Sequence, residues 1–143
     1  MKLLGFNLTR INAEKDEKNK SIKGLKVKNN IDLTNISEVK NNLLKTKEDL
    51  IAVYFKYSII YDPDFAKLNF EGNLLISLEP KNAKKLIKDW KENEKRIQED
   101  IKIDIFNFIL RKINLKALHL EEELNLPLHV SLPRIDKKAA LEK

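Results

Sequence analysis

Apolar and polar side chains alternate along the first half of the chain. In four stretches the apolar positions fall on every second residue, namely residues 2–13, 21–33, 49–61 and 65–78. The third stretch carries the largest side chains, and β-branched and aromatic residues of this kind pack well on a pleated surface. The alternation therefore predicts four β-strands.

Short polar segments separate these predicted strands. Glu14–Lys20 contains only charged and amide side chains, and Pro63 stands between two aspartates in Asp62–Asp64. Both segments are typical of exposed turns at the tips of hairpins. Residues 34–48 are less regular and predict a bulge and a turn. Together these signals predict an antiparallel meander.

The periodicity changes at Pro80, where apolar residues begin to follow the spacing of a helix. Ala83, Leu86, Ile87 and Trp90 predict a short helix, and a wide apolar stripe from about Arg96 to Leu124 predicts a long one. A break near Asn114 would fit the pattern. Two prolines exclude a helix from Leu126–Ile135, which is predicted to be extended and packed against the rest.

This order predicts the α+β class, with a four-stranded antiparallel sheet followed by a short and a long helix that cover one of its faces. Residues 1–143 are predicted to form a single domain, since the sequence shows no repeat and no linker. The third strand carries apolar groups on both sides, because Tyr54 and Ile60 stand opposite Phe55 and Ile59. Its second side is therefore predicted to contact another sheet or subunit.

Composition narrows the functions that the chain can have. The absence of cysteine excludes disulfides, thiolate metal sites and thiol nucleophiles. Leu3–Leu8 is too short and too interrupted for a signal peptide, and no stretch approaches the roughly 18 apolar residues of a membrane-spanning helix. A cytoplasmic protein without membrane insertion is expected.

Few side chains suggest catalysis or metal binding. His119 and Glu123 are four residues apart on one predicted helix face, and His129 would be a third ligand, but this spacing is a weak metal signal. An exposed histidine beside the acidic run Glu121–Glu123 is the simpler interpretation, with that run as a solvated face. The chain has no phosphate-binding glycine loop and no nucleophile–base pair, so neither an enzyme nor a bound cofactor is expected.

The positive charge leaves a second class of function open. The chain has 28 basic and 22 acidic residues, for a net charge of +6. Phe55, Tyr57 and Tyr61 could stack on bases, as strand aromatics do on RNA-binding sheets, but core packing is the simpler role. The lysines expected on strand and helix faces are spread out rather than gathered into a stripe. A ribosome- or RNA-associated basic protein therefore remains the alternative hypothesis.

Three segments carry a resemblance to a known family. Asn125–Pro133 follows the predicted long helix with the sequence NLPLHVSLP, Val53–Ile59 reads VYFKYSI, and Gly5–Leu8 reads GFNL. With the order of elements, these segments resemble the SecB family of export chaperones, and more closely archaeal SecB-like proteins. The resemblance covers nearly the whole chain as topology and patterning.

The resemblance implies a holdase chaperone that binds unfolded or nascent polypeptide in apolar grooves and assists protein export. It implies a homotetramer without cofactors. The groove residues implied by position are Phe55, Tyr57, Ile59, Phe70, Ile105, Phe106 and Ile109. The residues implied for contacts between copies are Leu86, Ile87 and Trp90. The bacterial chaperone is acidic whereas this chain is basic, so holding is better supported than handover to the SecA motor.

Overall fold

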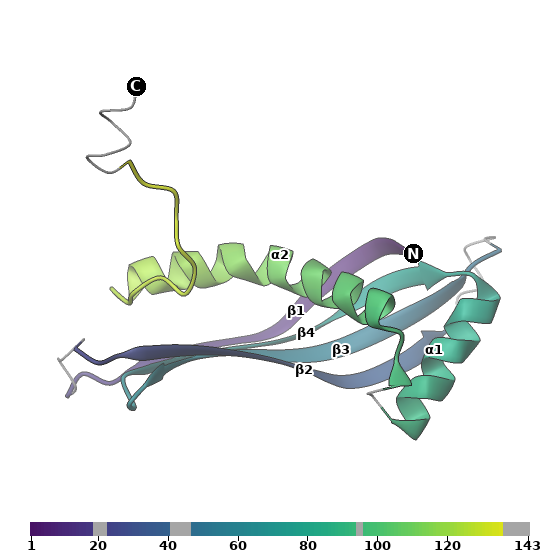
Figure 1. The fold of residues 1–143 in the computed structure, drawn as a ribbon, viewed down its shortest axis with the longest axis horizontal. Helices are drawn as coiled ribbons and strands as arrows, with labels where there is room; N and C mark the ends of the chain where they lie inside the picture. Colours follow the sequence, from purple (N-terminus) through teal and green to yellow (C-terminus); the bar gives the residue numbers. More distant parts are fainter. Residues whose placement is uncertain (19–22, 41–46, 94–95, 136–143) are drawn as a thin grey trace.

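The computed structural model describes residues 1–18, 23–40, 47–93 and 96–135 (Figure 1). Four strands and two helices follow one another, as the sequence predicts. They are β1 (Lys2–Lys15), β2 (Lys26–Val39), β3 (Asp49–Asp62), β4 (Ala66–Leu78), α1 (Pro80–Glu92) and α2 (Glu99–Glu123). The α+β class is thereby confirmed. The second strand extends beyond its predicted end because a bulge between Leu33 and Asn35 lets pairing continue to Val39.

The strands form one antiparallel sheet in the order β1-β4-β3-β2. The prediction of a simple meander is wrong, because β1 pairs with β4 and not with β2. The chain therefore passes from one edge of the sheet to the other between Lys15 and Lys26. Of the predicted hairpin tip at Glu14–Lys20, Glu14 and Lys15 belong to β1, and residues 19 and 20 lie outside the described residues. Strands β2, β3 and β4 follow one another as hairpins, and β1 lies beside β4. This arrangement is a Greek key.

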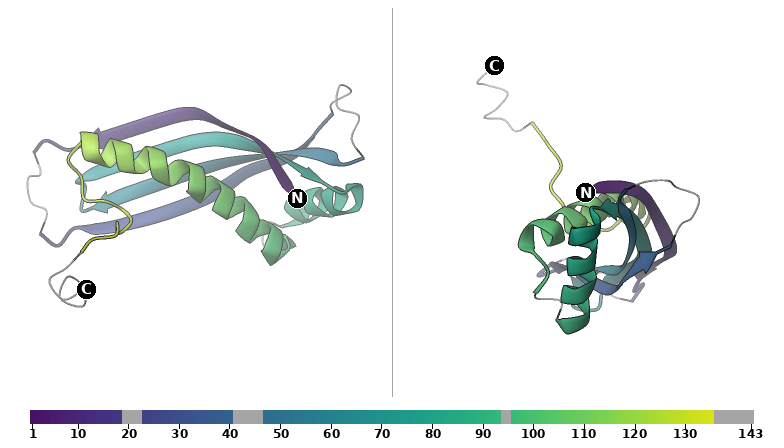
Figure 2. Two further views of the ribbon diagram at one scale, coloured as in Figure 1. Left: turned by 90° about the horizontal axis from the view of Figure 1, so that it is seen from above. Right: turned by 90° about the vertical axis from the view of Figure 1, so that its right-hand side faces the viewer.

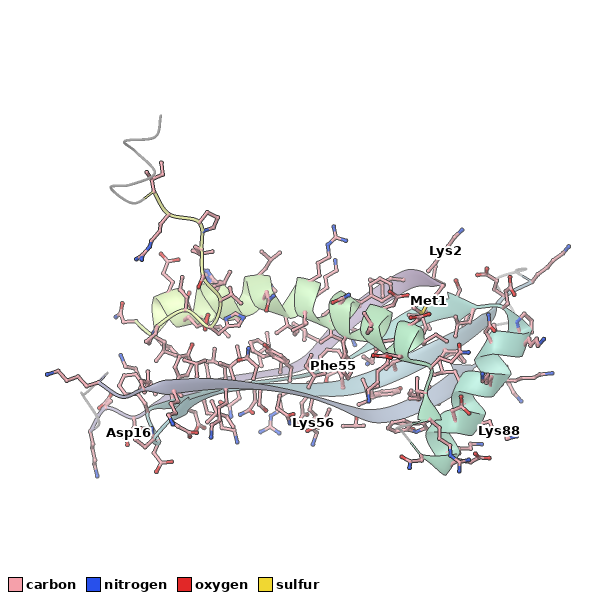
Figure 3. All side chains as sticks on the ribbon, in the orientation of Figure 1. Met1, Lys2, Asp16, Phe55, Lys56 and Lys88 are labelled. Atoms are coloured by element: carbon pink, nitrogen blue, oxygen red, sulfur yellow. The ribbon has the colours of Figure 1, made fainter. Side chains whose placement is uncertain are left out.

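One face of the sheet and α2 together form the hydrophobic core. The side chains of β3 alternate, so that Phe55 points toward α2 and Lys56 points away from it (Figure 3). The rings of Phe6 and Phe55 stack with their centroids 5.5 Å apart, which joins β1 to β3 within the core. From α2, a stripe at every fourth residue is fully buried: Ile105, Ile109, Ile113, Ala117 and Glu121. This spacing places all five side chains on one helix face.

Helix α2 is continuous and crosses the sheet diagonally (Figure 2). It has no break at Asn114. Its first turn carries Glu99 and Asp100, whose negative charges interact favourably with the positive end of the helix dipole. Asn125 adopts the left-handed conformation, with φ 53°, and ends the helix. The Lys15 ammonium of β1 donates to the carbonyl oxygen of Leu124 at 2.8 Å, which stabilises the negative end.

Helix α1 lies across the end of the sheet where β2 ends and β3 begins, and not on a face (Figure 1). The prediction that both helices cover one face is therefore wrong for α1. Pro80 occupies its first turn, where the missing N–H costs nothing. Ala83 and Leu86 are buried, whereas the remainder of the helix is largely polar. So narrow an apolar stripe suits a helix that closes the end of a core.

Candidate functional site

The residues that the resemblance implies for a client groove come together in the layer between the sheet and α2. Six of them are at most 1% exposed, and the seventh, Phe106, is half-buried. The six are Phe55, Tyr57, Ile59, Phe70, Ile105 and Ile109. They are core residues of the single chain, and their binding role remains a prediction. A polypeptide would contact them only if α2 moved away from the sheet.

Apolar side chains that solvent already reaches lie along the borders of this layer. Ile11 pairs with Phe70 and Val27 pairs with Tyr61, so both edge residues lie on the α2 side of the sheet. Ile11 is 47% exposed and Val27 37% exposed, although their partners are buried. We call the half-exposed apolar residues Ile11, Val27 and Leu128 the apolar rim. It provides apolar surface without any change in the fold.

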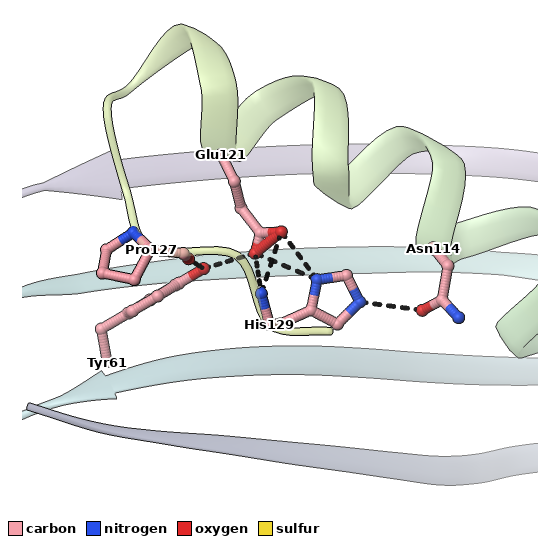
Figure 4. Close-up of polar contacts among 5 residues, drawn as sticks. All are labelled: Tyr61, Asn114, Glu121, Pro127 and His129. Atoms are coloured by element: carbon pink, nitrogen blue, oxygen red, sulfur yellow. Dashed lines mark hydrogen bonds and ion pairs between the residues drawn. The ribbon is translucent and has the colours of Figure 1, made fainter. Parts of the chain in front are cut away.

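A buried polar network closes one end of the same layer (Figure 4). Its centre is Glu121, the last residue of the α2 stripe, whose side chain is fully buried. The hydroxyl of Tyr61 donates to Glu121 and also lies 2.7 Å from the carbonyl oxygen of Pro127, so two acceptors share one proton. The backbone N–H of His129 donates to Glu121 Oε2 at 3.1 Å.

The ring of His129 completes this network. Nδ1 lies 2.7 Å from Glu121 Oε1, and Nε2 lies 2.9 Å from Asn114 Oδ1. Both ring nitrogens face oxygen acceptors, and an imidazolium can donate to both. If the Asn114 amide is rotated by 180°, its NH2 group faces Nε2 instead, and the neutral ring protonated on Nδ1 fits as well. In either state the buried carboxylate accepts several hydrogen bonds, which offset the cost of its burial.

Two tyrosines of β3 face this carboxylate. Burial and then the charge of Glu121 raise the pKa of Tyr57, whose hydroxyl has no hydrogen-bond partner in the described part of the chain. Burial, the hydrogen bond to Glu121 and the charges of Glu121 and Tyr57 raise the pKa of Tyr61 well above its usual range. Both hydroxyls therefore remain protonated at neutral pH. Their buried rings, like that of Phe55, cannot stack on bases in this structure.

The network fastens the segment after α2 onto the sheet. Pro127 and His129 bind Tyr61 and Glu121, and Leu126 between the helix and Pro127 is buried. Farther along, Leu132 and Ile135 are more than half exposed, so only the first part of the predicted apolar segment is packed. The prediction that Glu121 lies on a solvated face is wrong, whereas Glu122 and Glu123 are exposed. The sequence did contain a signal for the burial of Glu121, because this residue continues the four-residue spacing of the buried stripe of α2.

The structure separates the candidate metal ligands. His119 Nε2 lies 3.1 Å from Glu123 Oε1 on the exposed side of α2, whereas His129 faces Glu121. Across the described residues, no three histidine, aspartate or glutamate side chains are grouped to hold a metal ion.

Helix α1 carries the residues implied for contacts between copies. Leu86 belongs to the core of its own chain, while Ile87 and Trp90 are half-buried beside it. Next to them lies an open cavity of about 460 Å³, with Ala83 and Ile87 among its lining residues and charged groups from β2, β3 and α1 around it. Their contact role remains a prediction.

Comparison with known proteins supports the fold. No family model matches the sequence, and no curated protein does. The structure is similar to that of a SecB-like chaperone of Mycobacterium tuberculosis, solved in complex with the ChAD peptide of an antitoxin. The identity is 15%, the TM-score is 0.52, and the match covers 95% of this chain and 91% of that one. The two proteins therefore share the fold of a four-stranded antiparallel sheet followed by two helices. Within the described residues, no helix is long and apolar enough to cross a membrane.

Proposed function

We propose that this protein is a holdase chaperone that binds unfolded or nascent polypeptide along the layer between the sheet and α2. The observation that carries the proposal is the apolar rim, which exposes Ile11 and Val27 beside buried core residues. The shared fold with a chaperone that was solved with a peptide supports it.

Binding would begin at the rim, where an extended client can place apolar side chains against Ile11 at the β1 edge or against Val27 at the β2 edge. Burying a few hundred Å² of apolar surface at about 25 cal/mol per Å² contributes several kcal/mol, from which the cost of ordering the client is subtracted. Phe55, Tyr57, Ile59, Phe70, Ile105, Phe106 and Ile109 would contribute when α2 shifts. No nucleotide is required, because the protein only holds the client.

Several copies would act together. We propose a homo-oligomer, with the tetramer of the resemblance as the expected form, in which Ile87 and Trp90 of α1 contact a neighbour and Leu86 supports them from the core. Several rims in one particle would bind one long client by avidity. Help with protein export is part of the proposal, without commitment to a docking partner.

The test dilutes a chemically denatured, aggregation-prone client into this protein and follows light scattering at low and high salt. Suppression near a stoichiometric ratio that is insensitive to salt supports the holdase. Val27→Asp and Ile11→Asp are expected to weaken suppression at least several-fold, since each places a charge on the rim. Absence of suppression at every ratio refutes the proposal.

The chain offers a matched control for these variants. Leu115 lies on α2 and is 71% exposed, away from the apolar layer, so Leu115→Asp makes a similar change outside the proposed site. It is expected to leave suppression unchanged. Phe55→Asp and Ile109→Asp are less informative, because both residues are buried and their loss would unfold the chain.

A second candidate is an RNA- or ribosome-associated protein, favoured by the net charge of +6. RNA binding of this kind weakens steeply with salt because counterions are released from the phosphates. Binding to ribosomal RNA that disappears between low and high salt, without suppression of client aggregation, would replace the holdase by this candidate.

A further inference from the structure

The face of the sheet opposite α2, which we call the outer face, carries an ordered pattern of polar side chains. The registers align four residues, one from each strand, in a row across the sheet. From edge to edge this charged row reads Arg10, Glu71, Lys56 and Asp32. Lys56 points away from α2, and its ammonium lies 3.5 Å from the Glu71 carboxylate (Figure 3). The charges therefore alternate in sign and sum to zero.

The rows on either side of the charged row are rich in asparagine. One contains Asn12, Asn69, Ser58 and Asn30, and the other contains Asn7, Asn73, Tyr54 and Asn35. Each of these side chains both donates and accepts hydrogen bonds. Both edge strands also carry a bulge at the same level, at Thr9 and at Thr34, between the charged row and the Asn7 row. The two bulges keep the three rows straight across all four strands.

This pattern is complementary to itself. Consider a two-fold axis that runs parallel to the strands, between β3 and β4, with the outer faces of two copies packed together. The rotation places β1 of one copy opposite β2 of the other, and β4 opposite β3. Arg10 then faces Asp32, and Glu71 faces Lys56, so all four contacts join opposite charges. In the flanking rows, asparagine faces asparagine, serine or tyrosine.

We propose that the outer face is the surface on which a second copy of this chain packs, about this axis. This proposal specifies an interface for the homo-oligomer proposed above. It rests on that proposal only because it takes the partner to be a second copy of the chain. A nucleic acid or an anionic membrane would require net positive charge, which the row lacks. A different protein would need the reversed order of charges, whereas a second copy presents that order by symmetry.

The face is large enough for a stable contact. Leu50, Ala52 and Ser77 of this face are buried within the chain, so the exposed part runs from Tyr54 to the end of β3. At ~3.4 Å per residue and ~4.8 Å per strand, it presents about 600 Å². This lies at the lower end of the range for specific interfaces, ~600–1,000 Å² per partner. The packing also accounts for Tyr54, an aromatic residue on a solvated face, which would lie opposite Asn73 of the second copy. It gives the predicted subunit contact of this side of β3 a specific geometry.

Charge inversion tests the proposal through the molar mass, measured by light scattering after size-exclusion chromatography. One chain carries Arg10→Glu and Lys56→Glu, and a second carries Asp32→Lys and Glu71→Lys. Each has a row of one sign and is expected to lose the contact, which halves its mass relative to the parent. An equimolar mixture is expected to recover the parent mass, because opposite rows then face each other. Unchanged masses of the single chains, or a mixture that does not recombine, would overturn the proposal.

Two further variants separate loss of the contact from loss of the fold. Lys56→Glu combined with Glu71→Lys exchanges the two central charges of the row, so opposite charges still face each other across the axis, and the parent mass is expected. The second variant combines Lys112→Glu with Lys116→Glu on the exposed side of α2. It changes the net charge of the chain by the same amount as the first inverted chain, and it is also expected to keep the parent mass. A halved mass in either would overturn the proposal. Client suppression is measured on the same samples, so loss of suppression at the parent mass refutes only the holdase.

Discussion

The buried pair of Glu121 and His129 is predicted to be strongly coupled energetically. Both side chains are completely buried, and Nδ1 of the histidine lies 2.7 Å from the carboxylate. Replacing one partner by leucine leaves the other without its main contact in the interior, which costs about 3–5 kcal/mol. Replacing both removes the unpaired group, so the double variant is expected to lose no more than either single variant. The coupling energy should then reach about 3 kcal/mol.

Urea unfolding of Glu121→Leu, His129→Leu and the double variant measures this coupling. With a slope of about 2 kcal/mol per M, each single substitution should lower the midpoint by about 1.5–2.5 M. Proteolysis provides a second readout, because cleavage after α2 should accelerate in both single variants if the network fastens Leu126 and its neighbours. Additive losses in the double variant would refute the reasoning, since they would mean that the carboxylate and the imidazole do not interact.

The same helix contains a matched control. His119 and Glu123 form an ion pair of the same residue types at 3.1 Å, but their side chains are 69% and 60% exposed. The corresponding cycle of His119→Leu and Glu123→Leu should show a coupling of at most about 0.5 kcal/mol, because water screens exposed pairs. A coupling as large as that of the buried pair would indicate that burial is not the cause.

Three further predictions follow from the packing. A Cβ added to Gly72 would lie 2.3 Å from the carbonyl oxygen of Asn7, whereas a Cβ added to Gly5 would lie 3.8 Å from its nearest neighbour. Gly72→Ala should therefore lower the free energy of unfolding by about 1–3 kcal/mol, measured by heat or urea, and Gly5→Ala should lower it far less. Ile109→Ala should cost about 2–5 kcal/mol by the same assay, because Ile109 is fully buried. Burial raises the pKa of Tyr57 and Tyr61. The stability that the two protonated hydroxyls contribute is therefore complete below pH ~10. As the pH rises above this value, that stability is lost by about 1.4 kcal/mol per pH unit for each group. Tyr61→Phe should reduce that loss in unfolding curves recorded above pH 10, and an unchanged slope would contradict it.

Local patterns in the sequence predicted the elements, but not how the elements pair. Alternation predicts a strand at residues 2–13 from its own side chains, close to the observed β1, and the change in period at Pro80 marks the first helix. The partner of β1 is set by contacts with residues more than fifty positions away, such as Ile11 with Phe70. Two strands joined by a polar segment read as a hairpin, and nothing in that segment shows that it crosses to the opposite edge.

The position of the candidate groove residues was predicted, whereas their binding role stays a prediction. Phe55, Ile109 and their neighbours were correctly placed in one apolar layer, because periodicity gives the face on which a side chain lies. Periodicity does not give the distance between α2 and the sheet, so it could not show that these residues are buried rather than open to a client. Glu121 was missed because a carboxylate was assumed to face solvent, and His129 because its partner lies on another element.

The alternation of β3 also makes the two proposals separable. Phe55 and Tyr57 face α2, while Tyr54 and Lys56, which alternate with them along β3, face outward. Neighbouring residues of one strand therefore serve different proposed surfaces. A substitution on one side leaves the pattern on the other intact. If charge inversion of the outer face halves the mass and weakens suppression of long clients while short peptides still bind, avidity between copies is the cause. If short peptides are lost as well, assembly must shape the site itself, and the apolar rim of a single chain would not be sufficient.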